Sequence, residues 1–119
     1  MENHVSWIIE LDVKDGKLDA ATDLMEKMVK AAKTNEEETL HYEWYFNEDK
    51  TTCHIYERYE NSEAVLTHLQ HLNEHFMDDF MAAYEPKSLN VYGDPSDDAR
   101  EALDGLGANY FAFSDGFVR

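Results

Sequence analysis

Hydrophobic and polar residues alternate at the start of the chain, across Val5–Val13. This period of two predicts a β-strand, which the Asp15–Gly16 turn would end. Across Leu18–Ala32 the apolar residues recur every three or four positions instead, which predicts a helix with one buried stripe. Asp19 is expected either to cap this helix or to lie in its first turn, where an acid complements the helix dipole.

Two further alternating segments, 40–46 and 53–59, are separated by a polar turn centred near Asp49. The pattern predicts a β-hairpin. If its turn centres near residue 50, Glu43 and Glu57 face each other on one side of the sheet.

Helical periodicity returns after Asn61–Ser62, one of which is expected to be the N-cap. A bend is predicted near Asn73, and a second apolar stripe then continues through Tyr84. Pro86 is expected to close this helix, because proline commonly lies just past a helix end. Alternation returns at 89–92 and predicts a fourth strand.

The remaining residues predict a short helix from Pro95 or Ser96 to Leu103, followed by an aromatic strand or extended arm at 109–113. The chain is therefore expected to be one α+β domain, 1–119, with a core at 5–92 and a C-terminal extension at 93–119. The order β-α-β-β-α-β, with an antiparallel sheet and both helices on one face, is the ferredoxin-like split fold.

Large apolar side chains occupy both faces of several predicted strands. Ile8 points away from Trp7, and Tyr56 away from Ile55. A face this aromatic would leave a large exposed patch on a monomer, so we expect two copies to pair sheet on sheet as a homodimer. The arm at 109–113 would then either cross to the partner or fold back on its own subunit.

The chain has a formal net charge of −16, with 26 acidic and 10 basic side chains. Such a surface repels phosphate backbones and anionic headgroups, so binding to nucleic acid or to a membrane is not expected. The single cysteine, Cys53, cannot form an internal disulfide, which favours a reducing compartment. With no signal peptide or membrane-length apolar run recognised, the expected localisation is cytoplasmic.

Several segments resemble the antibiotic biosynthesis monooxygenase family. Residues 39–44 (TLHYEW) are similar to the second strand of that family, and residues 55–59 (IYERY) to its third strand. The stretch NSEAV at 61–65, followed by His68-Leu69 and His75-Phe76, resembles its second helix. The resemblance implies a dimeric α+β barrel with a pocket between sheet and helices. Some members of the family oxidise polycyclic phenols or quinols with dioxygen, without metal or flavin. The resemblance therefore also implies this activity for the present chain.

Three histidines follow the predicted second helix at i, i+3 and i+7, namely His68, His71 and His75. Their matches to the family motif make His75 the first candidate for a general base and His68 the second. They could also lie at a pocket rim or in solvent. The i, i+4 pair His71 and His75 has a spacing that zinc sites use, but no glutamate follows the first of them as in a His-Glu-x-x-His motif, and no metal is expected.

Glu43 and Glu57 are also catalytic candidates, because two close carboxylates raise the pKa of one of them, which suits a proton shuttle. A structural role, with Arg58 or a partner arginine neutralising them, is the alternative. The candidate substrate pocket is formed by aromatic and flanking residues: Tyr42, Trp44, Tyr56, Arg58 and Phe76. These aromatic residues could equally belong to the core.

No cofactor is expected. The sequence has no glycine-rich phosphate loop, and the Asn/Trp/His set of heme-degrading relatives is not matched by Trp7 and Trp44. Two functions remain. A cofactor-independent monooxygenase acting on a small aromatic quinol or polyphenol predicts an enclosed pocket with a histidine. A non-enzymatic ligand-binding or stress-associated homodimer predicts a filled core with histidines turned to solvent.

Overall fold

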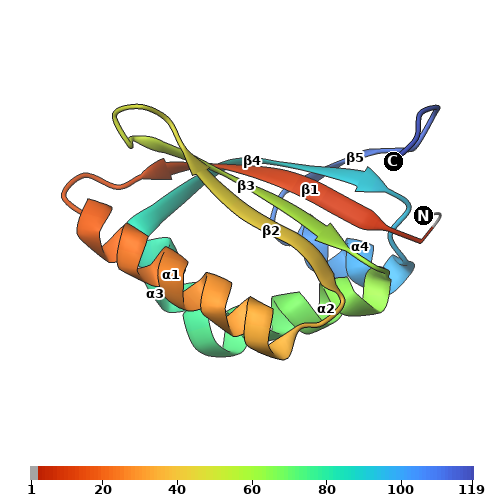
Figure 1. Ribbon diagram of the computed structural model, residues 1–119, viewed down its shortest axis with the longest axis horizontal. Helices are drawn as coiled ribbons and strands as arrows, with labels where there is room; N and C mark the ends of the chain where they lie inside the picture. Colours follow the sequence, from red (N-terminus) through yellow and green to blue (C-terminus); the bar gives the residue numbers. More distant parts are fainter. Residues whose placement is uncertain (1–2) are drawn as a thin grey trace.

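A five-stranded sheet with helices on one face makes up the computed structural model, which describes residues 3–119 (Figure 1). The elements in chain order are β1 Val5–Val13, α1 Leu18–Asn35, β2 Thr39–Phe46, β3 Thr52–Tyr59, α2 Ser62–His71, α3 Met77–Ala83, β4 Tyr84–Gly93, α4 Asp97–Asp104 and β5 Ala108–Phe111. The strand order is β2-β3-β1-β4-β5. This arrangement confirms the ferredoxin-like α+β prediction, and the sheet of the single chain is open rather than closed.

The helix boundaries follow their local sequence. Asn61 is the N-cap of α2 and accepts a hydrogen bond from the Ala64 N–H, and Ser96 caps α4 in the same way. The bend predicted near Asn73 is a π-helical turn, Leu72–Phe76, in which the Met77 N–H donates to the carbonyl of Leu72 five residues back. Asp19 lies in the first turn of α1, not at its cap.

The end of the second helix was predicted wrongly. Tyr84 begins β4 instead of ending the helix, and its hydroxyl donates to the Ala21 carbonyl at 2.7 Å. Pro86 lies inside β4, beside a register shift in the β1–β4 pairing between Glu10 and Leu11. This position tolerates proline because β5 pairs with β4 only from Leu89 onward, which leaves Pro86 on a sheet edge.

The hairpin register differs by one residue from the predicted one. Tyr42 pairs with Glu57 and Glu43 pairs with Tyr56. Because side chains alternate between faces, Glu57 points to the helices while Glu43 points to the outer face of the sheet. The predicted pair of facing carboxylates is therefore wrong.

Two groups of buried side chains fill the space between sheet and helices. One joins α2 and α4 to the sheet and consists of Val5, Trp7, Tyr59, Ala64, Val65, Leu69, Leu89, Val91, Ala99 and Leu103. The other joins α1 and α3 to the sheet and consists of Leu11, Ala21, Leu24, Met28, Cys53, Ile55, Phe80, Ala83 and Tyr84. Ile9 and Leu72 pack against both groups, so the two form one continuous layer.

The C-terminal extension forms the predicted helix and strand. β5 pairs in parallel with β4 of the same chain. The residues after Phe111 carry exposed Phe113, Phe117 and Val118. No helix within residues 3–119 has the length and hydropathy needed to cross a membrane.

Candidate functional site

His68 is buried beneath the sheet between two glutamates. Only 6% of the residue is exposed, against 8% for Glu36 and 4% for Glu57. The Nδ1 atom of His68 lies 2.9 Å from Oε1 of Glu36, and its Nε2 atom lies 3.2 Å from Oε1 of Glu57. The three residues come from α2, from the loop before β2, and from β3. We call them the Glu–His–Glu cluster.

Polar side chains at both ends extend this cluster. The hydroxyl of Tyr59 donates to Oε1 of Glu57 at 2.5 Å, and the hydroxyl of Thr39 donates to Oε1 of Glu36 at 2.9 Å. His71, one turn after His68, places its Nδ1 atom 3.0 Å from Oε2 of Glu36. About a third of the His71 side chain is exposed, so the hydrogen-bonded chain runs from the sheet to solvent.

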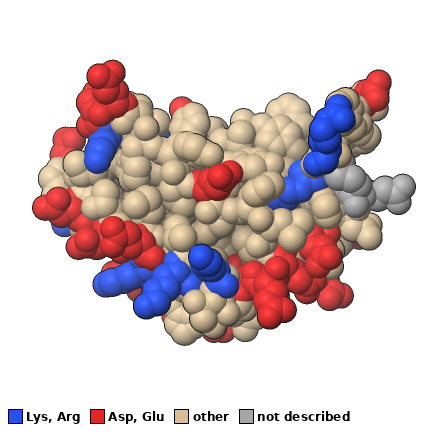
Figure 2. Space-filling model, in the orientation of Figure 1, with Lys and Arg blue, Asp and Glu red and all other residues tan. Residues whose placement is uncertain are grey.

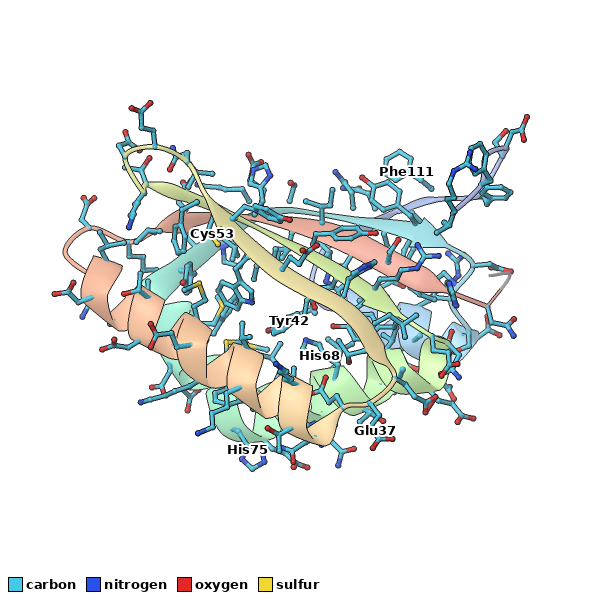
Figure 3. All side chains as sticks on the ribbon, viewed as in Figure 1. Glu37, Tyr42, Cys53, His68, His75 and Phe111 are labelled. Carbon is cyan, nitrogen blue, oxygen red and sulfur yellow. The ribbon has the colours of Figure 1, made fainter. Side chains whose placement is uncertain are left out.

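Aromatic rings enclose His68. The ring centroids of Tyr59, Tyr42 and Trp7 lie 5.2, 5.3 and 6.4 Å from that of the imidazole. Figure 3 shows His68 reaching from α2 into the interior with Tyr42 beside it under β2. Water is largely excluded here, which strengthens the electrostatic interactions within the cluster.

Ionisation follows from these contacts. Burial lowers the pKa of His68, but hydrogen bonds to Glu36 and Glu57 outweigh burial and raise this pKa to about 9. Burial raises the pKa of Glu36, and hydrogen bonds from His68, His71 and Thr39 overcome that effect and lower it to about 2. At neutral pH His68 is therefore an imidazolium that donates from both ring nitrogens, and Glu36 is ionised.

A groove of about 580 Å³ lies between α1 and the edge strand β2. It is lined by residues from both elements: Met25, Glu26, Val29, Lys30, Lys33, Tyr42, Glu43, Trp44 and Tyr45. Tyr42 belongs to both sites, since it lines the groove and also contacts His68. Burial, together with the charges of Glu57 and Glu36, raises the pKa of Tyr42 well above its usual value of 10. Its hydroxyl therefore stays protonated.

The structure separates the catalytic candidates that the sequence suggested. His68 and Glu57 meet in the buried cluster. His75 instead lies on the surface with 63% of its side chain exposed and points away from the sheet (Figure 3). The first-choice base is thus not in the pocket, because the π-helical turn rotates His75 off the face that carries His68.

The predicted pocket residues also divide between the two faces of the sheet. Tyr42 and Trp44 line the groove, and Phe76 is partly buried against the core under α1 and α3. Tyr56 and Arg58 are on the outer face, where Tyr56 packs on His41 and Arg58 donates to Nδ1 of His4 at 2.7 Å. They are therefore not part of this site.

Glu36 was not anticipated. It lies in the acidic segment 34–39, which sequence patterns identify only as a loop. One signal was present: this loop connects α1 to β2 at the end of the sheet where α2 begins. Among residues 3–119, no group of three or more His, Cys, Asp or Glu side chains is arranged to hold a metal ion.

Comparison with known proteins identifies the family. The model of the antibiotic biosynthesis monooxygenase family matches residues 5–84, and the chain belongs to this family. No curated protein sequence matches the chain. The helix α4, the strand β5 and the tail lie outside the matched range.

Solved structures share the fold at low sequence identity. MupZ from Pseudomonas fluorescens has a TM-score of 0.86 at 19% identity, covering 98% of this chain and 95% of that chain. A Nitrosomonas europaea protein named for the same family has a TM-score of 0.67 at 18% identity, covering 79% and 92%. Rv0793 from Mycobacterium tuberculosis has a TM-score of 0.62 at 17% identity, covering 79% and 97%. The likeness to MupZ therefore includes the C-terminal extension.

Proposed function

We propose that this protein is a monooxygenase that oxidises a small aromatic quinol or polyphenol with dioxygen in the α1–β2 groove. One observation carries the proposal: Tyr42 lines an aromatic groove and contacts the buried Glu–His–Glu cluster. An aromatic surface suits a planar ring, and a hydrogen-bonded cluster behind it suits proton transfer. Membership of the antibiotic biosynthesis monooxygenase family supports the same class of reaction.

In the proposed reaction a phenolic substrate loses a proton and the electron-rich anion reduces dioxygen. Where the reacting carbon is a methylene activated by neighbouring phenols, the methylene and one molecule of dioxygen give a carbonyl and one molecule of water. The carbon is oxidised and loses both hydrogens, one oxygen atom enters the product, and the other leaves as water with those two hydrogens. Dioxygen is the only oxidant needed.

The proton follows the hydrogen-bonded chain in this proposal. The proton acceptor in this proposal is the carboxylate of Glu57, which lies opposite Tyr42 in the β2–β3 pairing. Tyr42, whose ring packs on His68, takes up the substrate proton as its own hydroxyl proton passes to Glu57, and so it remains protonated. Because His68 is already protonated, it relays a proton between Glu57 and Glu36 and is not the initial base. His71 connects Glu36 to solvent.

Oxygen consumption by the metal-stripped protein with naphthoquinols and anthrone-type phenols tests this function. We expect uptake above autoxidation, and a decrease of roughly 100-fold or more in His68→Gln, since general acid–base groups contribute on that order. His75→Ala is the matched control, because its exposed side chain lies outside the cluster, and it should retain wild-type uptake. Equal rates in both variants would contradict the role of His68.

A non-enzymatic ligand-binding protein is the second candidate. The observation that favours it is the lining of the groove, which includes no histidine. If the protein binds aromatic phenols but consumes no oxygen with any of them, binding without oxidation becomes the function.

We also propose that a second copy of the chain covers the outer face of the sheet. Tyr45, Tyr92 and Phe111 are 55%, 38% and 51% exposed on strands that form this face. The β2–β3 hairpin and the C-terminal tail rise beyond the sheet on this same side (Figure 1). The outline of the molecule between these projections is concave (Figure 2), which suits a partner of matching shape.

A further inference from the structure

Two lysines line the α1–β2 groove although the chain is strongly acidic. Lys30 and Lys33 lie one helical turn apart on α1, and they are two of only 10 basic residues in a chain of net charge −16. Neither makes an ion pair with any residue in the range 3–119. Figure 2 shows a cluster of basic side chains over α1 with acidic side chains on both sides. Two carboxylates, Glu26 and Glu43, also line the groove, but neither forms an ion pair with Lys30 or Lys33. The two ammonium groups are therefore free to meet an anionic group of a ligand.

Apolar and aromatic side chains line another part of the groove. Met25 and Val29 line it from α1, and Tyr42 and Trp44 line it from β2. A volume of about 580 Å³ is within the range of small-molecule sites. These features together suit a ligand with a flat apolar body and an anionic group at one end.

The charges along α1 are separated by position. Glu26 lines the groove one turn before Lys30, and Lys33 follows in the last turn of the helix. An anionic group is therefore repelled from the Glu26 end and attracted to the Lys33 end. This separation fixes the direction in which a singly charged ligand lies along the groove.

We propose that the groove binds an aromatic carboxylate, with the ring against Tyr42 and Trp44 and the carboxylate between Lys30 and Lys33. The identification of this ligand class as the substrate rests on the proposed function. The binding itself does not depend on any reaction.

Isothermal titration calorimetry with a matched pair of ligands tests the inference. The pair is 1-hydroxy-2-naphthoate and 1-naphthol, which share the ring and the hydroxyl and differ in the carboxylate. At low ionic strength we expect the acid to bind about tenfold more tightly, a difference in line with two partly exposed ion pairs. Added salt should weaken the binding of the acid and leave that of 1-naphthol unchanged, because exposed charges are screened.

Three variants locate the site. In Lys30→Gln/Lys33→Gln the affinity for the acid should fall about tenfold, to that of 1-naphthol, whose own affinity does not change. Lys27→Gln removes the same charge from the same helix outside the groove and should change neither affinity by more than about twofold. Val29→Trp fills the groove and should weaken both ligands.

Equal binding of the two ligands, or equal effects of the Lys27 and Lys30/Lys33 variants, would overturn the inference. If neither ligand binds, the inference is overturned as well. Neither result decides the proposed function, because oxygen uptake with uncharged quinols is measured separately. If the protein consumes oxygen but does not bind 1-hydroxy-2-naphthoate more tightly than 1-naphthol, the oxygenase proposal stands. Only the inference of an aromatic carboxylate ligand is then overturned.

Discussion

His68 and His75 show how environment sets the role of a side chain. Both lie in the same helical stretch of the sequence, and both match motif positions of the family. However, 8% of the His68 side chain is exposed, against 63% of the His75 side chain. His68 is held as an imidazolium by Glu36 and Glu57. His75 is 3.8 Å from Glu74 in solvent, where ion pairs contribute little.

The raised pKa of His68 makes stability depend on pH. Folding shifts the pKa of this group from 6.5 to about 9, so its stabilising contribution is complete below pH 6.5 and is lost as pH rises through about 9. We expect the free energy of unfolding to fall by roughly 3 kcal/mol across that range. Urea denaturation at a series of pH values measures it.

His68→Gln is the control for that measurement. The variant should be less stable at neutral pH by about 3–5 kcal/mol, because the buried carboxylates lose their cation. Between pH 6.5 and 9 the free energy of unfolding of the variant should also change much less with pH than that of the wild-type protein. If the variant keeps the full wild-type slope, other groups cause the pH dependence.

At the scale of elements, α4 and β5 are part of the folded core and not an appended tail. Ala99 and Leu103 of α4 are fully buried with Val65 and Leu69 of α2, the helix that carries His68. The hydroxyl of Ser62 at the start of α2 also accepts a hydrogen bond from the Ser96 N–H. The extension therefore supports the helix that positions the cluster.

Leu103→Ala tests this packing. The side chain has no exposed surface, so its truncation should lower the free energy of unfolding by about 2–5 kcal/mol. Leu106→Ala is the matched control on the same extension, since Leu106 is 42% exposed and should change stability by less than about 0.5 kcal/mol. Equal, small effects in urea denaturation would show that α4 does not pack on α2 in solution.

At the scale of the molecule, the two faces of the sheet have different surroundings. Helices cover one face, and the other holds exposed aromatic rings, among them Tyr92 and Phe111, whose centroids are 5.7 Å apart. β5 and its Phe111 enlarge this face beyond the four strands of the ferredoxin-like core. A second copy is the partner that we propose for it.

Light scattering after size-exclusion chromatography tests the dimer. The wild-type protein should have twice the 13.8 kDa mass of the chain. In Tyr92→Glu/Phe111→Glu the mass should fall to that of the monomer, because like charges would be buried across the interface. Met81→Glu places a charge at an exposed apolar position on the helical side and should leave the dimer intact. A monomeric wild-type protein would contradict the proposal.

The sequence by itself determined the order and type of the elements. Alternation identified β1 and the hairpin, and helical periodicity identified α1 and α2, since these patterns record which side of each element is buried. The pattern gave the wrong prediction at Tyr84 and Pro86. Here a helix passes directly into a strand, and a buried apolar residue is compatible with either element. The ferredoxin-like fold followed from the element order alone.

Only the tertiary structure decided the site. The register of the hairpin turned Glu57 inward and Glu43 outward, a difference of one residue that reverses every face. Glu36 meets His68 across 32 positions of the chain, and no local pattern encodes such a contact. Periodicity reports burial along one element, whereas the cluster depends on how a loop, a helix and a strand meet in space.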